Sequence, residues 1–174
     1  MHTSGVLLAA AAGLAAAHLH NDHIARAATN TALQTTFPKP SGTSLIAAVQ
    51  TIAAGKSFDG GMKQWDRSVS TCNEQAEGGD ADAVFLLQDG ATLSNAIIGP
   101  NNGEGVHCLG TCTLNNIWWV DVCEDAATFK QSSGTSYVNG GGAKGASDKV
   151  LQHNGGVSIL FPYLCLSLRM RKWY

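Results

Sequence analysis

The chain has 174 residues, of which 44% are hydrophobic and 14% charged, and its formal net charge is −2. This length is typical of one domain with a sizeable buried core. The nearly balanced charge gives no electrostatic reason to expect a nucleic-acid partner or an anionic-membrane partner. Twenty glycines and few segments of helical periodicity indicate a chain rich in strands and turns.

Residues 1–17 contain an apolar run closed by small residues, and we expect a secretory signal peptide there. The run is shorter than the ~20 residues of a membrane span, so a membrane anchor is the weaker alternative, as is a short packed helix. Residues 18–43 are polar, and we expect a propeptide-like or wrapping lead-in segment. Leu45 to Ala54 carries apolar residues at helical spacing, with Ser44 as a candidate cap, and predicts one short helix.

Secretion would place the cysteines in an oxidising compartment, where disulfides form and persist. We expect four cysteines to pair, with all three connectivities open: Cys72, Cys108, Cys112 and Cys123. Cys165 is left without an expected partner.

An internal repeat determines the predicted architecture. ATLSNAIIG (91–99) aligns with CTLNNIWWV (112–120) at a shift of 21, and an approximate third copy surrounds Tyr137, Val138 and Asn139. Each copy has short strand-like runs and glycine-bearing turns, without room for a crossover helix. Such a period predicts the coils of a parallel β-helix, because each coil buries its apolar stripe by stacking on its neighbours. The alternative is an antiparallel sandwich, for which NNG at 101–103 would be the hairpin signal.

Two residue pairs within the repeat carry further expectations. Asn95 and Asn116 occupy equivalent positions, so their side chains are expected to form a hydrogen-bonded ladder rather than to be unrelated turn residues. Trp118 and Trp119 are adjacent, so on a strand one faces the core and the other faces outward. The outward ring could bind a sugar or pack under a neighbouring segment.

The repeat also aligns carboxylates. The same shift places Glu104 on Asp125, and Glu124 adjoins them. Stacked coils lie about 4.8 Å apart, so these like charges would require a cation between them. Carboxylate oxygens without a histidine or thiolate pattern favour Ca²⁺, with Asp82 or Asp80 completing the set. The alternative is a solvated acidic surface. Zinc is not expected, because His107 has no companion at metal-ligand spacing.

Two lysines complete the candidate site. Lys130 follows Asp125 by five residues, and Lys149 lies at nearly the spacing of the next coil. A calcium ion and lysines on one outer face would bind a polyanion, whereas the alternative is two ordinary surface lysines.

At four segments the sequence resembles the fungal secreted pectate lyases of polysaccharide lyase family 3: FDGGMKQWDR (58–67), EGGDADAVFLLQDGATLSNAIIG (77–99), EGVHCLGTCTLNNIWWVDVCEDAATFK (104–130) and GGGAKGASDKVLQHNGG (140–156). The resemblance implies an all-β, right-handed single-stranded parallel β-helix over residues 44–157. It also implies a secreted, Ca²⁺-dependent pectate lyase, which cleaves de-esterified α-1,4-polygalacturonate by β-elimination to unsaturated oligogalacturonates. We expect a monomer that binds neither nucleic acid nor a membrane.

Residue roles follow from this resemblance. Lys130 matches the family's proposed base, and Lys149 matches a basic substrate-binding position. The calcium region comprises Glu104, Glu124 and Asp125, to which we add Asp82 from the stacking argument.

Residues 158–174 depart from the family pattern. This tail is hydrophobic and then basic, lacks turn residues, and is typical of translation through an intron or a shifted frame. We therefore expect a β-helix that is incomplete at its C-terminal end and lacks family cleft residues. The alternative functions are an inactive truncated β-helix that binds pectate without cleaving it, and a purely structural solenoid.

Overall fold

The computed structural model describes residues 34, 36–146, 148–156 and 158–166. The expected signal peptide, residues 1–17, lies outside the described residues, as does most of the lead-in segment. The described part contains strands, turns and one 3₁₀ helix, η1 (Asp80–Asp82). Within it, no helix is long and apolar enough to cross a membrane.

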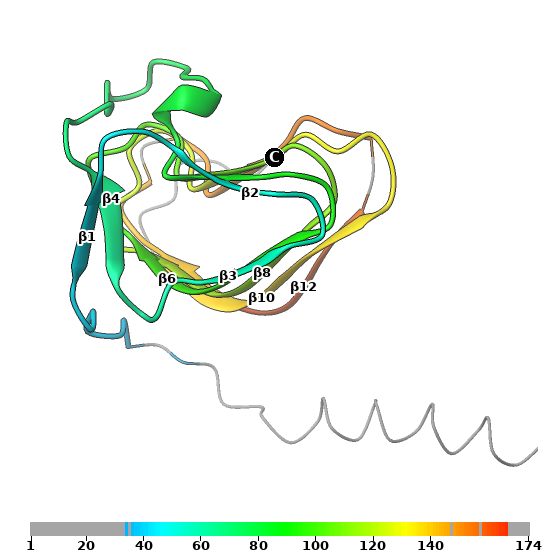
Figure 1. Ribbon diagram of the computed structural model, residues 1–174, viewed down its shortest axis with the longest axis horizontal. Coiled ribbons are helices and arrows are strands. Elements are labelled where there is room, and N and C mark those ends of the chain that lie inside the picture. Colours follow the sequence, from blue (N-terminus) through cyan, green and yellow to red (C-terminus); the bar gives the residue numbers. More distant parts are fainter. Residues whose placement is uncertain (1–33, 35, 147, 157, 167–174) are drawn as a thin grey trace, which may run out of the picture. The chain divides into compact units, whose positions relative to one another are not determined.

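Two parallel sheets make up the fold. The first has seven strands: β1 (Thr43–Ile46), β3 (Ser57–Asp59), β4 (Gln64–Arg67), β6 (Ala91–Ile98), β8 (Cys112–Trp119), β10 (Thr135–Ala143) and β12 (Ser158–Leu166). The second has five: β2 (Gln50–Ile52), β5 (Phe85–Leu87), β7 (Val106–Cys108), β9 (Ala127–Phe129) and β11 (Leu151–His153). From β5 onward the chain alternates between the sheets, so each pair of strands completes one coil. Figure 1 shows the coils stacked behind one another.

Strand pairing confirms the register that the repeat predicts. Thr92 pairs with Thr113 and Leu93 with Leu114, at a spacing of 21 residues. In the third copy, Tyr137 pairs with Thr113, three residues further along the chain than a strict repeat would place it. All described ladders are parallel, so the parallel β-helix class is confirmed and the antiparallel sandwich is wrong.

The predicted asparagine ladder is also confirmed. The Nδ2 group of Asn116 donates to Oδ1 of Asn95 at 2.9 Å. Both residues have positive φ, 57° and 53°, a conformation that asparagine tolerates better than most residues. The ladder therefore stabilises the bend at equivalent points of successive coils.

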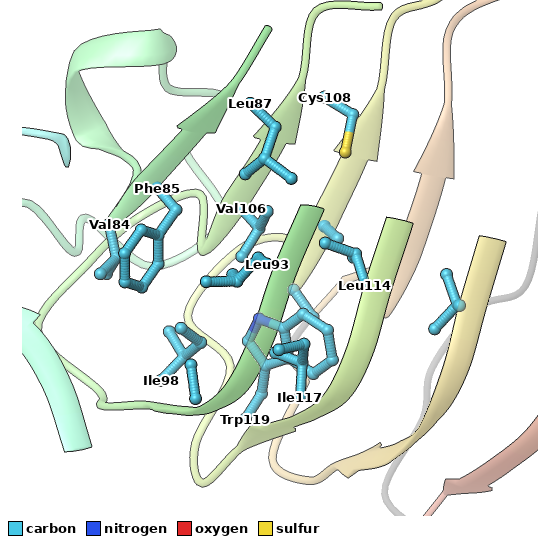
Figure 2. Close-up of a cluster of buried hydrophobic side chains, with 14 of the residues drawn as sticks. Val84, Phe85, Leu87, Leu93, Ile98, Val106, Cys108, Leu114, Ile117 and Trp119 are labelled. Atoms are coloured by element: carbon cyan, nitrogen blue, oxygen red, sulfur yellow. The ribbon is translucent and has the colours of Figure 1, made fainter. Parts of the chain in front are cut away.

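The core is a stack of apolar side chains between the two sheets. Leu93 and Leu114 lie over one another in register and are fully buried, and Phe85 and Trp119 join the same cluster (Figure 2). Burial of each such side chain contributes about 1.5–3 kcal/mol of hydrophobic free energy. This stack explains why one apolar stripe per coil is sufficient to hold the solenoid together.

Trp118 lies outside that cluster but is only 1% exposed, so the outward tryptophan is not available for sugar stacking. Its indole meets the ring of Phe37 edge-on at a centroid distance of 5.0 Å. Phe37 belongs to the predicted lead-in segment, and Lys144 Nζ lies over its ring, 4.8 Å from the ring centroid. Packing under a wrapping segment is therefore the role of Trp118.

The predicted helix over Leu45–Ala54 is wrong, because this segment forms β1 and β2. Its residues pair in register with later coils, including Leu45 with Asp66 and Thr51 with Leu86. Leu45 is 61% exposed, whereas a helix of that apolar pattern would bury it. Backbone pairing at the end of the solenoid outweighs a weak local helix propensity.

Two disulfides, Cys72–Cys123 and Cys108–Cys112, select one of the three connectivities left open.

Near the C-terminal end of the described residues, β12 pairs with β10 and extends the first sheet beyond Val157. The sheet thus continues into part of the segment expected to be an aberrant tail, with register shifts along the pairing.

Candidate active site

The turns that precede β7, β9 and β11 align three charged residues. Val106 pairs with Ala127, and Leu151 pairs with Ala127 from the other side. Two residues before these paired positions lie Glu104, Asp125 and Lys149, which are therefore equivalent on successive coils. The turns are joined by backbone hydrogen bonds, including Ala127 N to Val150 O at 3.0 Å. The sequence shift of 21 predicted the first pair of this column but not the lysine.

We use the name acid cluster for Glu104, Glu124 and Asp125, whose ligand atoms lie within 4.8 Å of one another. All three residues are buried, with 1–2% of their surface exposed. Among the described residues, none donates a hydrogen bond to Glu124 Oε2 or Asp125 Oδ1, although Asp125 Oδ1 lies 3.3 Å from Lys149 Nζ. Buried carboxylate oxygens without donors are costly. The cluster therefore fits a hard cation such as Ca²⁺.

Two glycines position Glu104. Gly78 N donates to Glu104 Oε1 at 2.6 Å, and a Cβ atom at Gly78 would lie 2.7 Å from that oxygen. Gly105 has φ +58°, and a Cβ atom there would lie 2.0 Å from Ala126 O. The Cys72–Cys123 disulfide ties the loop that carries Gly78 to the turn that carries Glu124. The Gly78 N–H thus holds the carboxylate of Glu104, and close packing at Gly105 fixes the neighbouring backbone.

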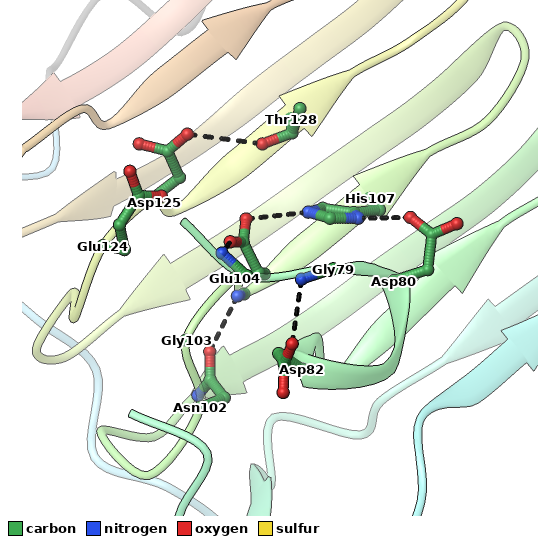
Figure 3. A network of polar contacts seen from close by, with 12 residues as sticks. Gly79, Asp80, Asp82, Asn102, Gly103, Glu104, His107, Glu124, Asp125 and Thr128 are labelled. Carbon is green, nitrogen blue, oxygen red and sulfur yellow. Dashed lines mark hydrogen bonds and ion pairs between the residues drawn. The ribbon is translucent and has the colours of Figure 1, made fainter. Parts of the chain in front are cut away.

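Asp82 does not belong to the acid cluster. Its Oδ2 accepts a hydrogen bond from Gly79 N at 2.8 Å and closes the start of η1 (Figure 3). Asp82, a predicted calcium ligand, thus has a local role in the turn. The stacking argument does not apply to Asp82, because η1 is inserted between coils.

A chain of polar contacts connects the acid cluster to Lys130. Glu104 Oε2 lies 2.9 Å from His107 Nε2, and Asp80 Oδ1 lies 2.7 Å from His107 Nδ1 (Figure 3). Lys130 Nζ then donates to Asp80 Oδ1 at 2.7 Å. Sequence reasoning missed this use of His107 and named Asp80 only as an alternative metal ligand. Glu104 and His107 lie close together on the same coil, but this spacing alone does not predict their contact.

The two lysines occupy different positions in the coil. Lys149 stacks over Asp125, whereas the equivalent of Lys130 on the next coil is Asn154, whose N–H donates to Phe129 O. Lys149 Nζ lies 3.2 Å from Glu124 Oε1 and also contacts Asp148. The two side chains also differ in access, because that of Lys130 is 32% exposed and that of Lys149 is 14% exposed.

Burial raises the pKa values of two acids in the site, whereas hydrogen bonds lower the pKa values of two others. Burial raises the pKa of Glu124 to about 7 and that of Asp125 to about 6, with the Asp125 charge adding to the first shift and Lys149 opposing the second. Burial also acts to raise the pKa of Glu104, but hydrogen bonds from His107 and Gly78 N–H hold it below its usual value. The hydrogen bond from Lys130 lowers the pKa of Asp80.

These shifts predict how pH affects the cation-free protein. The pKa values of Glu124 and Asp125 in the folded chain lie above their ordinary values of 4.5 and 3.8. The folded chain therefore keeps protons that the unfolded chain releases, and the free energy of unfolding falls as pH rises from about 4 to 8. The lowered pKa values of Asp80 and Glu104 act in the opposite sense, but below about pH 4.5. We expect a melting temperature in EDTA several degrees lower at pH 8 than at pH 5, since ~1 kcal/mol is worth about 2–4 °C at this size. Calorimetry at both pH values tests this, and equal values would contradict it.

The described residues thus form a parallel β-solenoid with a buried carboxylate cluster beside two lysines. The sequence profile described as "Pectate lyase" matches residues 34–160. The chain is 54% identical over 126 residues to "Probable pectate lyase D" of Emericella nidulans, covering 71% of this chain and 47% of that protein. It is 46% identical over 157 residues to "Pectate lyase H" of the same organism, covering 90% and 60%.

The fold is also similar to a solved structure, the catalytic domain of pectate lyase PelI from Erwinia chrysanthemi. The TM-score is 0.51 at 28% identity, covering 74% of this chain and 54% of that chain. The chain belongs to the pectate lyase family. It spans about half the length of the curated relatives it matches.

Proposed function

We propose that this chain acts in a secreted, calcium-dependent pectate lyase that cleaves de-esterified α-1,4-polygalacturonate by β-elimination. The observation that carries the proposal is the acid cluster, with its two oxygens that lack donors, joined to Lys130 through His107 and Asp80. The family membership supports the reaction class, and two disulfides are consistent with secretion.

In this proposal Glu104, Glu124 and Asp125 hold the calcium ion. Bound there, Ca²⁺ would neutralise the carboxylate of a uronate ring and so make its C5 proton easier to remove. Gly78 and the Cys72–Cys123 disulfide keep Glu104 in place before the cation arrives. Holding ligands in advance limits the reorganisation that cation binding requires.

Lys130 is the proposed base. As a neutral amine its Nζ accepts the C5 proton, the C4–C5 double bond forms, and the C4–oxygen bond breaks to release the leaving chain. Its side chain is partly exposed and can reach a bound polymer. Because only a deprotonated lysine can act as a base, we expect activity to increase at alkaline pH.

The Asp80 contact gives a prediction of its own. Asp80→Asn removes the ion pair that holds Lys130 Nζ and should leave this side chain freer to approach a bound polymer. We expect kcat/KM to rise severalfold, with folding unchanged. The measurement is a full pH–rate profile of both proteins. A parallel loss of activity at every pH would instead assign Asp80 a direct role in the reaction.

The type of product tests the proposed function. Purified full-length chain is incubated with polygalacturonate and, in parallel, with highly methyl-esterified pectin. Elimination predicts ultraviolet absorbance from unsaturated uronate ends with the de-esterified polymer. Retention on pectate without any product would favour the inactive, pectate-binding β-helix, and new reducing ends without absorbance would indicate hydrolysis.

A further inference from the structure

Arg67 is a buried cation that faces carbonyl oxygens rather than acids. It is the last residue of β4 and is only 9% exposed. Its Nη1 donates to Ala81 O and, at 3.1 Å, to Ala83 O, and its Nη2 donates to Ala47 O at 3.1 Å. In the part of the chain that the structure describes, no ion pair joins this guanidinium to a carboxylate. A buried charge without an acid partner is costly unless hydrogen bonds compensate, and here the bonds come from these three carbonyl groups.

The three bonds connect segments that are far apart in the sequence. Ala47 directly follows β1, whereas Ala81 lies in η1 and Ala83 directly follows it. The guanidinium of arginine is planar and presents its N–H groups in fixed directions, so one side chain can bond several carbonyls at once. The carbonyls at the end of a short helix have no partner within that helix. Because β1 and β4 pair with each other, Arg67 ties η1 to the first coil of the solenoid.

The short helix η1 carries Asp80, whose carboxylate lies between two groups of the candidate site. Asp80 Oδ1 is 2.7 Å from His107 Nδ1 and 2.7 Å from Lys130 Nζ (Figure 3). The Asp80 side chain is 44% exposed, so the position of its backbone determines whether it reaches these partners. Thr71 Oγ1 also bonds η1, at 3.0 Å from Asp82 O, but Thr71 belongs to the same inserted segment between β4 and β5. The contact from Arg67 differs because it comes from a strand of the solenoid.

We infer that Arg67 is a positioning residue, which holds η1 so that Asp80 restrains Lys130. This inference rests on the proposed role of Lys130 as the base, and it adds a residue that sets how firmly the base is held before substrate binds. The described hydrogen bonds of the Arg67 guanidinium lie on η1, on the residue after it and on the residue after β1. Its effect on Lys130 therefore passes through Asp80.

The reactivity of the Lys130 amine tests this inference directly. An amine-reactive ester labels the lysines of the full chain at pH 8, and mass spectrometry follows Lys130. Arg67→Met removes the bonds to η1, so Asp80 should leave its position, and we expect Lys130 to be labelled severalfold faster, at a rate approaching that in Asp80→Asn. Arg67→Lys keeps the charge but not the planar fork, and should accelerate labelling by a smaller factor. Neither change should accelerate it further when combined with Asp80→Asn.

Asp66→Asn is the matched control for a general loss of stability. Asp66 adjoins Arg67 on β4, is 1% exposed, and accepts hydrogen bonds from Asn101 N and Nδ2, each at 2.9 Å. Its replacement should destabilise the same strand without releasing η1. Labelling of Lys130 should therefore stay near the parental rate, with exposed Lys56 as the internal reference in every protein.

Rates on polygalacturonate at saturating calcium give a second readout. If Arg67 acts through Asp80, Arg67→Lys should change kcat/KM in the same direction as Asp80→Asn, and should have no effect in the Asp80→Asn background. Labelling does not require activity, so a parent that forms no unsaturated product would overturn the proposed function, and labelling alone would then decide the role of Arg67.

Each labelling result either supports or overturns the inference. Faster labelling of Lys130 that disappears in the Asp80→Asn background and is absent from Asp66→Asn supports it. Labelling at the parental rate in the folded Arg67 variants overturns it, as does an equal acceleration in the Asp80→Asn background or in Asp66→Asn. Where Arg67→Met does not fold, Arg67→Lys decides.

Discussion

Lys130→Ala is expected to lower turnover on polygalacturonate by about 10²–10⁴-fold, the usual cost of losing a general base. The residue directly follows β9, and its Nζ forms an ion pair with Asp80 at a partly exposed position. Its removal should therefore affect the reaction more than folding or substrate affinity. Steady-state kinetics should show the loss in kcat, with KM nearly unchanged.

Lys130→Arg is the matched variant for this prediction. Arginine keeps the positive charge and can still pair with Asp80, but it gives up its proton far less readily than lysine. We expect it to fold like the parent and to be nearly as inactive as Lys130→Ala. If Lys130→Ala keeps close to parental turnover at alkaline pH, the base assignment fails and Lys149 becomes the next candidate.

Replacing a member of the acid cluster should have the second largest effect. Glu104→Ala or Asp125→Ala should weaken calcium binding by at least the ~10- to 100-fold that loss of an outer-shell partner commonly costs, because each removes a buried charged ligand. Activity at low calcium should fall in proportion, and excess calcium should recover part of it. Calorimetric calcium titrations and rates measured across calcium concentrations test this together.

Two further variants make that result specific. Glu74→Gln removes one charge from the exposed loop beside the site and should leave calcium affinity unchanged. Asp82→Asn keeps an oxygen that can accept from Gly79 N, so the structure predicts little effect on calcium. A loss as large as that of Asp125→Ala would restore Asp82 as a ligand, and calcium affinity unaffected by the Glu104 and Asp125 changes would overturn the acid cluster as the site.

Much of the fold was predictable because a solenoid repeats its register. The shift that aligns Leu93 with Leu114 also places Glu104 on Asp125, and the structure keeps this spacing in both sheets. Once the coils are stacked, the pairing of Glu104 with Asp125 follows without any tertiary information. The asparagine ladder was predictable for the same reason.

Features that break the repeat could not be predicted in the same way. Asp80 comes from η1, an insertion between coils, so no register places it against His107 and Lys130. The third coil is three residues longer, which moves Lys149 from the expected position beside Lys130 onto Asp125. The helix expected near Leu45 failed because pairing with neighbouring coils is a long-range interaction that local patterns do not reveal.

Calcium dependence is the central claim, and the rate of unsaturated product formation at controlled free calcium tests it most directly. The full-length chain is assayed on polygalacturonate first in EDTA, then with calcium added stepwise, and its calcium affinity is measured separately by calorimetry. We predict no measurable product in EDTA and a saturating rise with calcium, whose midpoint agrees with the measured affinity. Product formation at the same rate in EDTA and in calcium would contradict the account.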